Sequence, residues 1–107
     1  MACPDGWHLS SDVEWSQLEQ AIGGAAGKKL KSTTWDGSDV VGFGVLPAGS
    51  RYDGGSFSYV GSNANFWSSS EDGADYAWSR YLYSGRGKLV RDGYDKKSGF
   101  SVRCLKD

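Results

Sequence analysis

The chain has 107 residues and a formal net charge of −1 at pH 7. This length predicts one domain with a core of its own. The near-neutral charge gives no electrostatic basis for binding nucleic acid or an anionic membrane, and no apolar stretch approaches the ~20 residues needed to cross a bilayer. We therefore expect neither a nucleic-acid partner nor membrane insertion.

The clearest local signal is a helix over Ser11–Ile22. Ser11 and Glu14 have the spacing of a capping box, in which each side chain accepts a hydrogen bond from a free backbone N–H of the first turn. Apolar residues then recur at helical spacing, and Gly23-Gly24 ends the run. A second short helical piece is expected at Gly27–Ser32. We interpret its lysines, Lys28, Lys29 and Lys31, as a solvated face.

From Thr33 onward the helical periodicity disappears. The sequence then predicts a loop, an extended segment that ends in a turn, a hairpin turn and a second extended segment. These span residues 35–39, 42–49, 51–57 and 66–71, respectively.

Residues 77–83 alternate in the way a strand requires. Trp78, Arg80 and Leu82 would face the core, while Ser79, Tyr81 and Tyr83 would point outward. A turn is expected at 84–87, a short extended piece at 89–91 and a second turn near Asp92-Gly93. The last strand is expected at 100–104, where Phe100, Val102 and Cys104 alternate.

Cys3 and Cys104 are the only cysteines of the chain. A disulfide between them would tie the two ends of a small secreted domain together. The alternative is a pair of free, buried thiols in a cytosolic protein, because cysteine is among the most buried residue types. The first residues do not have the pattern of a signal peptide, and we expect residues 1–107 to be one domain excised from a larger secreted or surface protein.

Several sequence blocks, in order along the whole chain, resemble the Fibrobacter succinogenes major paralogous domain of bacterial secreted and surface proteins. They are CPDGWHLSSDVEW (3–15), GKKLKS (27–32), GFGVLPAG (42–49), FWSSSE (66–71), AWSRYL (77–82) and GFSVRCLKD (99–107). The resemblance implies an α+β, C-type lectin-like fold of the branch shared with formylglycine-generating enzymes. Such a fold has one main helix and a loop-rich antiparallel sheet, with paired N- and C-terminal strands.

Relatives of that fold suggest three activities. The E-P-N or Q-P-D and W-N-D patterns of calcium-dependent lectins are absent, and a formylglycine-generating enzyme would need a reactive cysteine. The variable proteins of diversity-generating retroelements carry randomised binding residues near the C-terminal end, and residues 71–97 resemble such a surface. One sequence does not reveal whether this copy is diversified.

No set of residues predicts catalysis. His8 is the only histidine, and beside Trp7 and Leu9 it is expected to be structural. There is no zinc-ligand cluster, no nucleophile with a matching base and no carboxylate pair singled out by its spacing. We expect no enzyme and no cofactor.

Calcium is the one metal with candidate ligands, at Asp36 and Asp39 or at Glu71, Asp72 and Asp75. Neither group has EF-hand spacing, and the competing interpretation is that these side chains stabilise turns.

The favoured functional residues lie in 71–97, where tyrosines are mixed with Ser, Gly, Asp and Arg as in an antibody paratope. The competing interpretation is ordinary, half-buried strand tyrosines. The candidate ligand-binding residues are Asp72, Asp75, Tyr76, Ser79, Tyr81, Tyr83, Arg86, Asp92, Tyr94 and Asp95. Trp35 either stacks on a sugar or fills the core, and the core is favoured.

The sequence thus predicts a non-catalytic module at a bacterial cell surface or in a secreted protein, serving in adhesion or other recognition. The ligand would be a protein or a carbohydrate, and other domains of the parent protein would be its neighbours. The alternatives are a structural spacer without a ligand and an enzyme of formylglycine-generating type.

Overall fold

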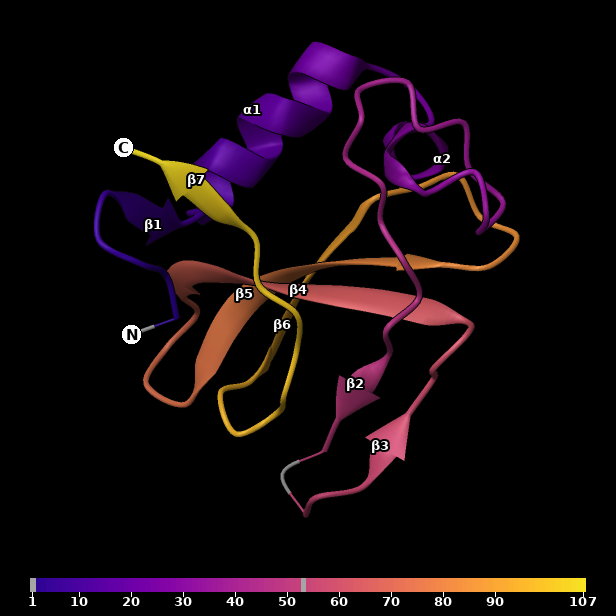
Figure 1. The fold of residues 1–107 in the computed structure, drawn as a ribbon. Helices are drawn as coiled ribbons and strands as arrows, with labels where there is room; N and C mark the ends of the chain where they lie inside the picture. The colour runs from indigo at the N-terminus through magenta and orange to yellow at the C-terminus, as the bar shows by residue number, and fades with distance from the viewer. Residues whose placement is uncertain (1, 53) are drawn as a thin grey trace.

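The computed structural model describes residues 2–52 and 54–107. In this part of the chain, two helices and seven strands form an α+β fold with antiparallel sheets (Figure 1). The elements are β1 (Trp7–Leu9), α1 (Asp12–Ile22), α2 (Ala26–Leu30), β2 (Ser50–Arg51), β3 (Phe57–Ser58), β4 (Asn63–Glu71), β5 (Tyr76–Tyr83), β6 (Val90–Asp95) and β7 (Cys104–Lys106). The predicted fold class, with one main helix, is confirmed.

The two ends of the chain lie side by side. Strands β1 and β7 pair antiparallel, with Leu9 opposite Cys104. A disulfide joins Cys3 to Cys104, whose Cα atoms are 5.9 Å apart. The predicted bridge is therefore confirmed, and the alternative of two free thiols is wrong.

Helix α1 begins and ends where the sequence predicts. The Ser11 hydroxyl accepts a hydrogen bond from Glu14 N at 3.1 Å, and Glu14 Oε1 accepts one from Ser11 N at 3.0 Å. Gly23 follows the last turn with φ = 84°, a conformation that glycine adopts without steric cost. Its N–H donates to the Glu19 carbonyl and closes the helix.

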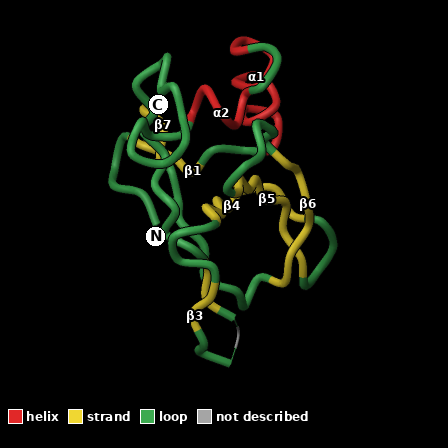
Figure 2. The backbone as a smooth tube through the Cα atoms, turned by 90° about the vertical axis from the view of Figure 1, so that its right-hand side faces the viewer, coloured by secondary structure: helices red, strands yellow, loops and turns green. Residues whose placement is uncertain are grey.

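The main sheet has the order β4-β5-β6 and separates two layers. Helix α1 lies on one side of this sheet, and the β2–β3 hairpin lies on the other (Figures 1 and 2). The hydrophobic core fills the space between the helices and the face of the main sheet on the side of α1. Its buried residues are Trp15, Ala26, Leu30, Trp35, Val45, Ala64, Phe66, Leu82 and Leu89.

Trp35 belongs to this core, as the favoured interpretation predicted. It is 7% exposed, and its indole N–H donates to the Ser84 hydroxyl at 3.0 Å. The ring is thus not available to stack on a ligand.

The prediction of a solvated lysine face is wrong for Lys31, which is completely buried. Its ammonium group donates to the Tyr83 carbonyl at 2.6 Å and to the Arg86 carbonyl at 2.8 Å. It also lies 4.7 Å from the ring centroid of Trp35. Burial lowers the pKa of Lys31, while the two carbonyls and the ring satisfy the charge.

Two boundaries in the C-terminal third also differ from the prediction. Asp92 and Gly93 lie inside β6, and the chain turns instead after Asp95, where Ser98 N donates to the Asp95 carbonyl. The last strand is β7, not residues 100–104. Between β6 and β7 the chain makes two isolated bridges, from Gly99 to Arg51 and from Ser101 to Phe66. This segment therefore bonds to two different parts of the chain and does not form the continuous strand that was expected.

Candidate functional site

Strand β5 divides its side chains between the two faces of the main sheet, as its alternation predicts. On the face away from α1, Tyr81 pairs with Asn65 of β4, and Tyr83 pairs with Asn63. Tyr94 of β6 lies on the same face. We call these five residues the tyrosine face.

The tyrosine rings contact one another. The ring centroids of Tyr81 and Tyr83 are 5.8 Å apart, and those of Tyr81 and Tyr94 are 6.4 Å apart in an edge-on arrangement. Tyr94 packs edge-on against Phe100 at 5.3 Å. All three tyrosines are half-buried, and burial raises the pKa values of Tyr81 and Tyr94. The face is therefore an aromatic surface supported from beneath, on which the Tyr81 and Tyr94 hydroxyls remain protonated at neutral pH.

Ser79 does not belong to this surface, although the alternation predicts that it points outward. The side chain lies on the expected face but is completely buried. Its hydroxyl donates to the Asp92 carbonyl of the adjacent β6 at 2.9 Å. Because its side chain is shorter than those of the neighbouring tyrosines, Ser79 cannot reach a ligand on this surface. It instead links β5 to β6 through its hydrogen bond.

Four other predicted residues lie elsewhere: Asp72, Asp75, Tyr76 and Asp95. Tyr76 pairs with Asp95 at the end of β5, on the face opposite to that of Tyr81. Asp72 and Asp75 are in the exposed turn between β4 and β5. The ten predicted residues therefore do not form one patch.

Asp92 and Arg86 lie at opposite margins of the tyrosine face. Asp92 is exposed and pairs across the strands with Ser79, and its charge adds to the rise in the pKa of Tyr81. The Arg86 guanidinium lies 5.9 Å from the ring centroid of Tyr83. These two charges flank the aromatic surface.

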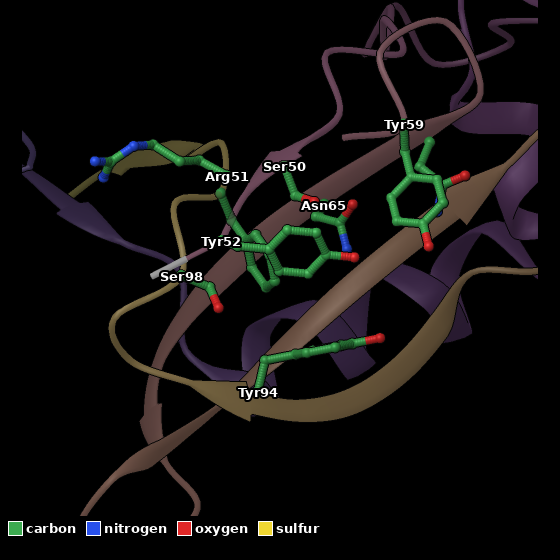
Figure 3. A pocket seen from close by; sticks show the side chains of 9 residues that line it. Ser50, Arg51, Tyr52, Tyr59, Asn65, Tyr94 and Ser98 are labelled. Atoms are coloured by element: carbon green, nitrogen blue, oxygen red, sulfur yellow. The ribbon is translucent and has the colours of Figure 1, made fainter. Parts of the chain in front are cut away.

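Beside the tyrosine face is a pocket of about 130 Å³ that the sequence did not predict (Figure 3). It lies between the β2–β3 hairpin, the main sheet and the segment that precedes β7. The residues around it are Ser50, Arg51, Tyr52, Tyr59, Asn63, Asn65, Tyr94, Ser98 and Phe100. We call it the hairpin pocket.

Part of this pocket had a signal in the sequence. Asn63 and Asn65 alternate with the apolar residues Ala64 and Phe66, so a strand places the two amides on the face away from the core. Their register with the tyrosines of β5, and the folding of the hairpin over them, have no signal in a single sequence.

Three of the carboxylates considered for metal binding make other contacts. Asp36 accepts a hydrogen bond from Gly85 N at 3.1 Å, and Asp39 accepts one from Gly44 N at 2.8 Å. Glu71 forms an ion pair with Lys96 at 2.9 Å. Within residues 2–52 and 54–107, no group of three or more His, Cys, Asp and Glu side chains is placed to hold a metal ion.

His8 links three parts of the fold. Its Nδ1 lies 2.7 Å from Asp107 Oδ1, and its Nε2 lies 2.9 Å from Glu14 Oε2. Hydrogen bonding to Glu14, and next to Asp107, raises the pKa of His8. These contacts connect β1, α1 and the C-terminus.

The fold and the order of the sequence blocks agree with one family model, that of the Fibrobacter succinogenes major domain, which matches residues 1–106. The chain belongs to this family. No curated protein and no solved structure matches it.

The Fibrobacter succinogenes major domain described here thus holds its tyrosine face and hairpin pocket on a scaffold closed by a disulfide between its ends. No helix among its described residues is long and apolar enough to cross a membrane.

Proposed function

We propose that this domain is a non-catalytic ligand-binding module of a bacterial surface or secreted protein, acting outside the cytoplasm. The observation that carries the proposal is the continuous aromatic surface formed by Tyr81, Tyr83 and Tyr94. Tyrosine gives a large rigid contact at low entropic cost, and its hydroxyl both donates and accepts hydrogen bonds.

The aromatic packing beneath these rings favours a role in ligand binding. Tyr94 packs on Phe100, which in turn stacks on Trp67 with 4.4 Å between ring centroids. Because the rings are held before a ligand arrives, less side-chain entropy is lost on binding. The disulfide supports an oxidising location, since such bonds persist mainly outside the cytoplasm.

Both cysteines lie in the bridge, which leaves no thiol for chemistry of the formylglycine-generating type. We therefore do not propose that activity for this chain.

The test is an array of immobilised glycans and peptides probed with the oxidised, fluorescently labelled domain. We expect at least one array member to bind the wild type, and the Tyr81→Ala/Tyr83→Ala double variant to lose that signal. Tyr76→Ala is the matched control, because Tyr76 is an exposed tyrosine on the opposite face of β5.

An amide spectrum of each variant establishes that it is folded. If the double variant unfolds, the map of perturbed amides in the labelled wild type replaces it, and the perturbations should centre on β5 and β6. A domain that binds nothing on the array, or that binds with the tyrosine face unperturbed, would instead be a structural spacer or carry its site elsewhere.

A further inference from the structure

The hairpin pocket is rich in hydroxyl groups that come from separate segments. Figure 3 shows the hydroxyl ends of Tyr52, Tyr59 and Tyr94 turned toward the same space. These tyrosines belong to the two sides of the β2–β3 hairpin and to β6. After burial and Asp92, the charges of Tyr81, Tyr52 and Tyr59 add to the rise in the pKa of Tyr94, as expected for neighbouring hydroxyls. Each hydroxyl can both donate and accept a hydrogen bond.

Asn65 adds an unpaired polar group to the wall of this pocket. Its side chain lines the pocket and is 5% exposed. Its Oδ1 atom is buried, and no hydrogen bond reaches it from the residues that the structure describes. A buried carbonyl oxygen without a donor is unfavourable and uncommon in folded proteins. The Asn65 amide is therefore a polar side chain of the pocket wall whose oxygen lacks a partner among the described residues.

The size of the pocket limits what can enter it. At about 130 Å³ it is smaller than the roughly 300–1,000 Å³ of pockets that take drug-sized molecules. It therefore suits a single ring or one short side chain of a larger ligand.

The chemistry of the lining favours a neutral, hydroxyl-bearing ring. Arg51 is the one charged residue among the described lining residues, and Figure 3 shows its guanidinium directed away from the three tyrosine hydroxyls. The remaining lining groups are hydroxyls, amides and aromatic rings. Such groups hydrogen-bond the hydroxyls of a sugar and cover its apolar ring face.

Hydrogen bonds between backbone segments hold the walls in place. Arg51 and Gly99 exchange two of them, at 2.8 and 2.7 Å, which fixes β2 against the segment before β7. Ser101 N donates to the Asn65 carbonyl at 2.9 Å and ties the same segment to β4. Tyr59 has φ = 63°, which is unusual for a bulky residue, and its carbonyl accepts hydrogen bonds from Ser62 N and Asn63 N. The pocket is thus preorganised.

We propose that the hairpin pocket binds one neutral sugar ring of a glycan through the Tyr52, Tyr59 and Tyr94 hydroxyls and the Asn65 amide, without calcium. This inference rests on the proposed function and specifies the ligand class. The rest of the glycan would extend over the neighbouring tyrosine face.

The experiment is an NMR titration of the isotope-labelled, oxidised domain in EDTA. The probes are the neutral methyl glycosides of glucose, galactose, mannose and N-acetylglucosamine, each at millimolar concentrations, and a parallel set of short lysine- and arginine-containing peptides. The readouts are the side-chain amide signal of Asn65 and the ring signals of the three pocket tyrosines. Tyr52→Phe and Tyr94→Phe remove one hydroxyl each, and Tyr76→Phe is the control.

We expect a glycoside to shift the Asn65 signal saturably in EDTA. Loss of one hydrogen bond should weaken this binding about 3- to 10-fold in Tyr52→Phe or Tyr94→Phe and leave it unchanged in Tyr76→Phe. Two hydroxyl variants are used so that the result does not depend on the folding of one.

Two results would overturn the inference: no glycoside shifts the Asn65 signal in EDTA, or the shifts occur only away from the pocket. If a peptide instead perturbs Tyr81 and Tyr83, and no glycoside shifts the Asn65 signal, the proposed function survives and the sugar assignment falls. If neither set of probes binds and no member of the array binds, the sugar assignment and the proposed function both fail.

Discussion

Arg80 Nη1 lies 2.6 Å from Asp12 Oδ1, in an ion pair that joins the middle strand of the main sheet to the first turn of α1. The Arg80 side chain is 1% exposed and that of Asp12 is 17% exposed. Arg91 binds the same carboxylate from the adjacent strand, at 2.9 Å, and covers the Trp78 ring at 3.5 Å from its centroid. One carboxylate therefore holds two guanidinium groups beneath the helix.

The first prediction concerns the loss of this carboxylate. Asp12→Ala would leave the Arg80 guanidinium buried without its charge partner, although it keeps a hydrogen bond to the Ser16 hydroxyl. We expect the free energy of unfolding to fall by about 3 kcal/mol in chemical denaturation. Glu71→Ala breaks the exposed pair with Lys96 and should cost far less, because solvent screens this pair. Equal costs for the two variants would contradict the central role of Asp12.

The same carboxylate predicts a pH dependence. Hydrogen bonding from Arg91, and then contact with Arg80, holds the pKa of Asp12 below its ordinary value of 3.8. A lowered pKa in the folded state means that this contribution to stability is present above pH 3.8 and is lost as the pH falls through the folded value. Denaturation measured between pH 5 and pH 2 should show a steeper loss of stability for the wild type than for Asp12→Ala.

His8 should act in the opposite direction. Because its pKa is raised above 6.5 by Glu14 and Asp107, its contribution to stability is present below pH 6.5 and is lost as the pH rises through the folded value. An NMR titration should find a His8 pKa above 6.5, and Glu14→Gln should lower it. A His8 pKa at or below 6.5 in the wild type would show that these contacts do not persist in solution.

The disulfide closes a loop in which its cysteines are 101 positions apart. Constraining the unfolded chain to this extent should stabilise the domain by about 2–5 kcal/mol. Denaturation of the Cys3→Ala/Cys104→Ala variant against the oxidised wild type measures the effect. The amide spectrum of the tyrosine face should be preserved in the variant at low temperature, since the bridge joins β7 to the segment before β1 and neither belongs to the main sheet.

Lys31 provides a test of buried charge. Lys31→Met keeps the length of the side chain but leaves the Tyr83 and Arg86 carbonyls without their donor, and we expect a loss of about 1–3 kcal/mol. Lys28→Met on the exposed side of α2 is the control and should change stability by less than about 0.5 kcal/mol. A neutral result for Lys31→Met would mean that water replaces the ammonium group.

Much of the local structure follows from the sequence because its causes lie close together along the chain. The capping box at Ser11 and Glu14 needs only a three-residue spacing, and the alternation of β5 needs only a period of two. Both were confirmed. The predictions for Ser79 and Lys31 were wrong because burial depends on distant parts of the chain. The alternation of a strand gives the side of the sheet on which Ser79 lies, but not how deeply it is buried. The polar residues around Lys31 suggest a solvated side chain, but carbonyls far away in the sequence bind it in the folded protein.

The sequence by itself determined the main helix and the side of β5 that carries Tyr81 and Tyr83, and its resemblance to a family indicated the α+β class and the paired ends. It left a disulfide and two free thiols both open, and the structure decided for the disulfide. Only the tertiary structure decided which residues share a site. The Arg51–Gly99 bridge and the registers of β4, β5 and β6 bring Tyr52, Asn65 and Tyr94 around one pocket. Contacts between residues that are far apart in sequence depend on how loops close and strands align, and no local pattern of residue types encodes those distances.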